Sequence, residues 1–316
     1  MNSILKAMSL VVFSMLSGCQ VAGRDPLLRL TLLVVDDQGS PVEAAYAGFG
    51  GAGRPKSANS EGKAVRVDGL TDRLGIFTGE IAVWDATHSG YEINKPGYYT
   101  SWASFSAHPP VSGKWQPWNP TIKVVLKRIR NPVPMYAKRA TSSLPKLNVP
   151  VGYDLEMGDW VLPYGNGKTA DIIFVGELNK KGDRIYDWRM KLTFSNPGDG
   201  IQRFKPEPEP VYFRSPYEAP EEGYFSVWDL HRSRTGPNVM EQTNYEEAGG
   251  YFLRVRSVSD KNGKIVKALY GKIYGDFFNM VHYLNPDGTR NMEYDSKRNL
   301  LKAPKSWDSR YYEVGP

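Results

Sequence analysis

Residues 251–274, with the sequence YFLRVRSVSDKNGKIVKALYGKIY, carry the most informative pattern in the chain. Two runs rich in β-branched and aromatic residues, 251–258 and 264–274, flank the turn Asp260-Lys261-Asn262-Gly263. Asn-Gly pairs tolerate the positive φ angles that hairpin turns require. The stretch therefore predicts a long antiparallel hairpin in the C-terminal half.

Shorter runs of the same kind recur through the rest of the sequence, among them 28–35, 121–126, 171–176 and 188–194. Turn residues separate them, since the chain has 31 Gly and 23 Pro, and no long stretch places apolar residues at helical spacing. We therefore expect an all-β protein. Its 316 residues allow two antiparallel β-sandwich domains in tandem after a signal peptide.

The N-terminus has the three parts of a secretion signal. Lys6 precedes the apolar run 8–16, and the small residues Ser17 and Gly18 stand before Cys19. The apolar run is too short to cross a bilayer, which needs about 20 residues. Leu16-Ser17-Gly18-Cys19 also resembles the lipobox of bacterial lipoproteins. An ordinary secretory signal with a chance cysteine is the alternative.

The lipobox resemblance implies removal of residues 1–18, a diacylglyceryl group on Cys19 and a fatty acid such as palmitate on the new N-terminus. Several acyl chains on one residue give stable membrane anchoring. Cys19 is the only cysteine, so no intramolecular disulfide can form and acylation would cap a lone thiol. Residues 19–26 then form a lipidated tether. Because Gln20 replaces the aspartate of inner-membrane lipoproteins, the resemblance favours the outer membrane, facing the periplasm or the cell surface.

Residues 27–129 are expected to form the first β domain. After an opening strand come Gly39-Ser40-Pro41-Val42 and Ala44, then Thr71-Asp72 through Phe77, Gly97-Tyr98 and a closing strand at 121–126. This pattern resembles the carboxypeptidase regulatory-like family, which implies a transthyretin-type β-sandwich without catalytic residues. An aromatic-rich insertion, 102–118, departs from the pattern and leaves the strand order open.

Residues 130–150 carry Pro132, Pro134 and Pro145 and are expected to form a semi-rigid linker. Residues 151–316 are then a second β-sandwich. This half resembles bacterial lipoproteins whose function is unassigned, so the resemblance implies no activity.

No catalytic, metal or cofactor motif stands out. Gly165-Asn166-Gly167-Lys168-Thr169 lacks the first glycine of a P-loop, because Leu162 occupies that position. His88, His108, His231 and His282 lie too far apart in sequence for a local zinc motif. A hydrolase site within 151–316 remains an alternative if two carboxylates, or His231 and a nucleophile, line a deep cleft. The candidate carboxylates are Glu156, Asp159, Glu246 and Glu247.

Aromatic residues are the feature with most functional content, because flat rings can stack on sugars. Trp102, Trp115 and Trp118 crowd the 102–118 insertion, and a second group recurs later: Trp160, Tyr164, Trp188, Tyr224 and Trp228. Core packing is the alternative use of these rings.

The leading hypothesis is a non-enzymatic envelope lipoprotein with a role in binding or assembly. The alternative is a carbohydrate- or cell-wall-binding lipoprotein that uses Trp102, Trp115 and Trp118. The expected partners are a membrane, through lipid on Cys19, and an envelope glycan or protein. The net charge of +6 is modest for this length, and no nucleic-acid motif is present.

Overall fold

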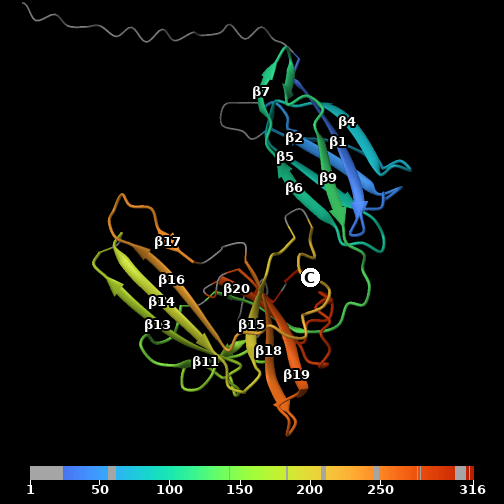
Figure 1. Cartoon of the computed structure of the whole chain (residues 1–316). Coiled ribbons are helices and arrows are strands. Elements are labelled where there is room, and N and C mark those ends of the chain that lie inside the picture. Colours follow the sequence, from blue (N-terminus) through green and yellow to red (C-terminus); the bar gives the residue numbers. More distant parts are fainter. Residues whose placement is uncertain are drawn as a thin grey trace, which may run out of the picture.

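The computed structural model describes residues 24–55, 62–141, 143–182, 184–207, 211–244, 249–275, 277, 279–302, 311–312 and 314–316. The expected signal peptide and Cys19 lie outside these residues. The described residues form strands and no α-helix, and they contain no helix that could span a membrane. The prediction of an all-β chain with two β-sandwiches in tandem is confirmed (Figure 1).

The strands of the first sandwich are β1 (Leu27–Asp36), β2 (Tyr46–Ala52), β3 (Ala64–Leu70), β4 (Ile76–Ala82), β5 (Asp85–Asn94), β6 (Ser101–Phe105), β7 (His108–Val111), β8 (Lys114–Gln116) and β9 (Thr121–Leu126). Those of the second are β10 (Tyr136–Thr141), β11 (Val151–Asp154), β12 (Asp159–Trp160), β13 (Ile172–Lys180), β14 (Tyr186–Thr193), β15 (Gly200–Phe204), β16 (Val227–Arg234), β17 (Gln242–Thr243), β18 (Gly250–Ser259), β19 (Ile265–Tyr274) and β20 (Asn279–Asn285).

The first sandwich packs a sheet of order β4-β1-β8-β7, with β9 also paired to β1, against a sheet of order β3-β2-β5-β6. Alternate residues of β1, from Leu28 to Val34, are fully buried and meet Phe49 of the facing sheet. This period-2 burial is the expected signature of a strand with one face on the core. Two pairings depart from the antiparallel rule: β9 and, at a single residue pair, β8 both run parallel to β1.

The structure corrects the expectation that residues 102–118 form an aromatic loop. It folds into β6, β7 and β8, which add strands to both sheets. Ser112 and Gly113 both take positive φ, of 51° and 74°, and form the two-residue turn between β7 and β8. β7 contains Pro109 and Pro110, and it is an edge strand, where proline is tolerated.

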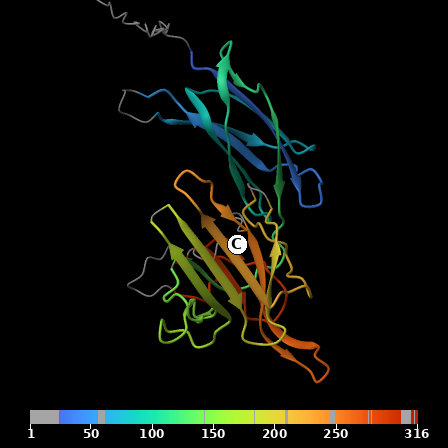
Figure 2. The same ribbon diagram turned by 60° about the vertical axis from the view of Figure 1, so that its left-hand side comes forward.

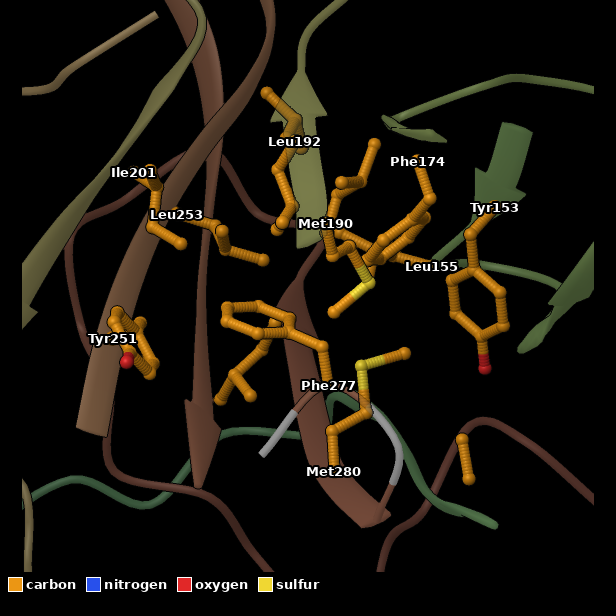
Figure 3. Packing of buried hydrophobic residues seen from close by; sticks show 14 of the residues in the cluster. Tyr153, Leu155, Phe174, Met190, Leu192, Ile201, Tyr251, Leu253, Phe277 and Met280 are labelled. Carbon is orange, nitrogen blue, oxygen red and sulfur yellow. The ribbon is translucent and has the colours of Figure 1, made fainter. Parts of the chain in front are cut away.

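The second sandwich packs a sheet of order β10-β20-β19-β18-β15 against one of order β12-β11-β13-β14-β16-β17. Their inner faces meet in one apolar core, in which Phe174 and Met190 face Tyr251 and Leu253 (Figure 3). The predicted hairpin is β18 and β19, and Gly263 supplies the positive φ of 80° in its turn. Asp260 Oδ1 accepts the backbone N–H of Asn262 and Lys264, which closes that turn.

The linker expected at 130–150 is only partly irregular, which corrects that expectation. Residues 136–141 form β10, an edge strand paired along its length with β20. Ala137 and Ala140 are buried, but alanine and charged residues have low strand propensity, so the sequence carried little sign of a strand here.

Arg256 links the two sheets of the second sandwich through buried ion pairs. It sits at an irregularity in β18 with a positive φ of 55°, and its guanidinium donates to both oxygens of Asp171 at 2.8 and 3.1 Å. It also pairs with Asp154 at 3.3 Å and with Glu156. We call Arg256, Asp154, Asp171 and Glu156 the Arg256 cluster.

Residues 211–217 join the two sandwiches. The backbone N–H of Tyr212 donates to the Thr100 carbonyl at 3.3 Å, and Phe213 packs on Tyr99 with ring centroids 5.2 Å apart. Lys127 of the first sandwich donates to the Ser215 carbonyl at 2.9 Å. Figure 2 shows the first sandwich seated on one end of the second. These bonds fix the two bodies relative to one another.

Candidate functional site

The three tryptophans expected to share a ligand-binding loop do not share a face. Trp115 is 6% exposed in the core of the first sandwich, and its Nε1 donates to the Val83 carbonyl at 3.2 Å. Trp118 is half-buried, with Lys114 Nζ 4.7 Å from its ring centroid. Trp102 lies on β6, in the other sheet, and is 58% exposed. The expectation that all three tryptophans form one site is therefore corrected. Ligand binding by Trp102 or Trp118 alone stays a prediction.

A different aromatic site lies in the second sandwich, on the inner face of β13, β14 and β16 beyond the core. Residues on that face form successive cross-strand rows: Phe174–Leu192–Trp228, Gly176–Met190–Leu230, Leu178–Trp188–Arg232 and Lys180–Tyr186–Arg234. The first two rows belong mainly to the apolar core. The residues of the last two rows other than Arg234, together with Leu144 and Leu147, border an open cavity of about 540 Å³. We call it the Trp188 pocket.

One wall of the pocket is the segment that follows β10. Leu144 and Leu147 line the cavity, and the backbone N–H of Asn148 donates to the Gly176 carbonyl at 2.8 Å. A Cβ on Gly176 would lie 2.8 Å from the indole of Trp188 and would also collide with Leu144. The missing side chain at Gly176 therefore lets the indole and the wall pack over this strand.

A carboxylate at the edge of the pocket holds two of its side chains. Glu241 Oε1 accepts hydrogen bonds from Nε and Nη2 of Arg232, at 3.0 and 2.9 Å, and Oε2 accepts one from the hydroxyl of Tyr186. The hydrogen bond between Tyr186 and Glu241 lowers the pKa of Glu241 and raises the pKa of Tyr186. Glu241 is therefore ionised and Tyr186 neutral near neutral pH, so the network orients the phenol ring and the guanidinium.

Positive charge predominates around the pocket. Lys180 and Arg234 flank Tyr186 in the last row, and Arg232 lies beside Trp188 in the row before it. Glu241 is the carboxylate that bonds to Arg232. The Nε of Arg234 is buried and has no hydrogen-bond partner among the described residues. An aromatic surface beside excess positive charge suits a ligand that combines an apolar face with an anionic group.

The candidates for hydrolysis lie elsewhere and serve visible structural roles. Glu156 belongs to the Arg256 cluster, and Asp159 accepts backbone N–H bonds from Trp160 and Asn166. His231 Nε2 lies 3.2 Å from Asp187 Oδ2 on the outer face of the sheet. Glu246 and Glu247 lie outside the described residues.

The other histidines are dispersed as well. His88 and His108 are exposed, and His282 is fully buried. Within the described ranges no three His, Cys, Asp or Glu side chains gather as metal ligands would.

Sequence reasoning named Trp188 but missed Tyr186, Arg232 and Glu241. The alternation of Tyr186, Trp188 and Met190 does mark one strand face. The sequence also shows that this face becomes more polar from Met190 towards Tyr186. The sequence could not place Arg232 and Glu241 beside Trp188, because their position depends on the pairing of β14 with β16, which are separated by residues 194–226.

No family model matches the sequence, and no curated protein matches it. Among solved structures, the chain is similar to 3-chlorocatechol 1,2-dioxygenase from Rhodococcus opacus 1CP, with 14% identity over 33% of this chain and 61% of that one and a TM-score of 0.25. It is also similar to the shaft pilin SpaA of Lactobacillus rhamnosus GG, with 11% identity over 74% and 88% and a TM-score of 0.21.

A protein from Bacteroides uniformis described as carbohydrate binding shares 10% identity over 84% of this chain and 97% of that one, with a TM-score of 0.19. The chain spans 61% and 58% of the length of the chlorocatechol dioxygenase and of a hydroxyquinol 1,2-dioxygenase from Pseudomonas putida DLL-E4. At these TM-scores the likenesses carry no functional inference.

Proposed function

We propose that this protein is an exported lipoprotein, anchored by lipid on Cys19, whose second sandwich binds an acidic saccharide in the Trp188 pocket. The observation that carries the binding proposal is the change along one sheet face, from apolar core rows to the rows of Trp188 and Tyr186 with their basic neighbours. This narrows the broader expectation of an envelope protein with a binding or assembly role to one pocket and one class of ligand.

The chemistry of an acidic sugar fits this pocket in two ways. The C–H face of a pyranose ring is apolar and stacks on indole or phenol rings, while its hydroxyl groups bond to polar side chains at the rim. A carboxylate on the sugar forms charge-assisted hydrogen bonds with guanidinium or ammonium groups. Trp188 and Tyr186 supply the rings, Arg232 and Lys180 line the cavity with positive charge, and Arg234 adds a further positive charge beside Tyr186.

Trp188→Ala is expected to weaken binding of acidic polysaccharide at least tenfold, because the stacking surface is lost. The measurement is retardation in native gels that contain polygalacturonate, alginate or solubilised peptidoglycan. Tyr164→Ala is the matched control, since Tyr164 is a partly exposed aromatic residue outside the pocket. Equal retardation of Trp188→Ala and the unaltered protein, or no retardation by any of the three polymers, contradicts the proposal.

Cys19→Ala is expected to release the protein from membranes and to abolish incorporation of labelled palmitate, because the thiol that accepts the diacylglyceryl group is gone. The measurement is fractionation of cells grown with the labelled fatty acid. A Ser17→Ala variant, which keeps a small residue in the lipobox, serves as the control and should stay membrane-bound. Labelling that persists in Cys19→Ala disproves the anchor.

A further inference from the structure

The outer face of the first sandwich has a second cavity, of about 430 Å³, on the sheet β3-β2-β5-β6. The inner face of this sheet packs on the core through Phe49, Tyr91 and Ile93. The outer face carries glycine where other residues would project side chains. We call the cavity the Gly90 trough; it is bordered by Gly50, Arg66, His88, Gly90, Glu92 and Trp102.

Gly90 has no visible structural reason to be glycine. A Cβ at this position would meet no atom within 4 Å, and Gly90 is not among the residues with positive φ. Glycine in a strand interior is destabilising by roughly 0.5–1 kcal/mol relative to a residue with a side chain. Such a glycine often marks a place where a ligand approaches the backbone closely. Gly90 lies directly opposite Gly50 on the neighbouring strand, so the two together form a flat floor.

Trp102 stands beside this floor. It lies opposite Glu92 in the register of β5 and β6, and more than half of its surface is exposed. An exposed indole at the edge of a cavity offers a flat apolar face with a polar N–H edge, which suits stacking on a sugar ring. The ring and the glycine floor together form a platform for a flat apolar face.

The polar groups of the trough favour an uncharged ligand. Arg66 Nη2 lies 3.2 Å from Glu92 Oε2, so the trough presents a paired donor and acceptor rather than net charge. Asp68, outside the cavity lining but near Arg66 over Gly48, adds a second carboxylate to this part of the sheet. Sugar hydroxyl groups both donate and accept hydrogen bonds, and they can therefore bond to both members of such a pair.

We propose that the Gly90 trough binds a neutral polysaccharide, with a pyranose ring stacked on Trp102 over Gly90 and Gly50 and its hydroxyl groups bonded to Arg66 and Glu92. This site does not rest on the Trp188 pocket, because the two lie on different sandwiches and favour ligands of different charge. A chain with both sites would engage two kinds of envelope glycan at once.

Gly90→Val tests the trough without disturbing the fold. Valine suits a strand and its Cβ would meet no atom within 4 Å, so the thermal stability should be unchanged or higher, while its methyl groups occupy the space above the strand. Retardation in native gels that contain neutral xylan, mannan, β-glucan or galactan is expected for the unaltered protein and should fall at least tenfold in Gly90→Val and in Trp102→Ala.

Two controls separate this site from the other. Trp118→Ala changes a half-buried ring elsewhere in the first sandwich, and Trp188→Ala removes the acidic-saccharide site; both should keep full retardation by the neutral polymer. The proposal is overturned if none of the four neutral polymers retards the protein. It is also overturned if Gly90→Val, folded and stable, is retarded as strongly as the unaltered protein.

Discussion

Replacing Arg256 with methionine is expected to lower the free energy of unfolding of the second sandwich by about 3–5 kcal/mol, because the change leaves buried carboxylates without their cation. Asp171 is fully buried, and burial raises its pKa in spite of Arg256. Burial would also raise the pKa of Asp154, but backbone N–H donors, among them those of Lys168 and Thr169, lower it below its usual range. An ionised Asp154 therefore depends on these donors and on Arg256.

Equilibrium unfolding in urea measures this change in the free energy of unfolding. Two further variants show how much of it depends on burial and on the geometry of the guanidinium. Arg189→Met removes an exposed ion pair with Asp187 and should change stability by less than about 1 kcal/mol. Arg256→Lys keeps the charge but cannot bond to both oxygens of Asp171 at once, so its loss should be intermediate. A loss below about 1 kcal/mol in Arg256→Met would show that the cluster is not a stabilising link.

Acid is expected to destabilise the protein through His282, and His282→Gln should remove that contribution. Burial lowers the pKa of His282 to about 3, and its Nε2 donates to the Leu155 carbonyl at 3.1 Å. The unfolded chain binds a proton on this ring near pH 6.5, whereas the folded protein stays neutral until about pH 3. Stability from this group is therefore complete above pH 6.5 and falls, on the order of 5 kcal/mol in all, as the pH drops from 6.5 towards 3.

The readout is the slope of unfolding free energy against pH between 4 and 6. Glutamine can keep the donor to Leu155 but has no proton to gain, so the difference between the two proteins should shrink by about 1 kcal/mol per pH unit on acidification. Carboxylates such as Asp154 also lose stability in acid, but they do so equally in both proteins. Parallel curves would mean that His282 is not the titrating group.

Regular alternation made much of the fold predictable from sequence. The closing strand was expected at 121–126 and found there as β9, and the 251–274 hairpin is β18 with β19. Both runs have strong β propensity and clear turn residues. β10 was missed because its residues favour a strand only when β20 lies beside them, and that pairing joins segments far apart in sequence.

The candidate sites were less predictable, because tryptophan alone does not reveal its burial. Trp115 and Trp102 look equivalent in the sequence, yet one fills the core and the other is largely exposed, since Trp115 lies on the inner face of its sheet and Trp102 on the outer face of the other. The Gly90 trough could not be recognised either: a glycine in a strand is informative only after its neighbours show that a side chain would have fitted.

Residues 211–217, which bond the two sandwiches together, set the distance between the second sandwich and the start of β1. β1 begins at Leu27 and ends at Asp36, which pairs with Arg128 beside this segment, and its ten residues span about 33 Å. If Cys19 carries the proposed lipid, the eight residues 19–26 would add at most about 28 Å. If the N-terminus is anchored as proposed, these lengths set an upper limit on how far the Trp188 pocket can lie from the membrane surface. The pocket would then reach polymer up to tens of ångströms from that surface.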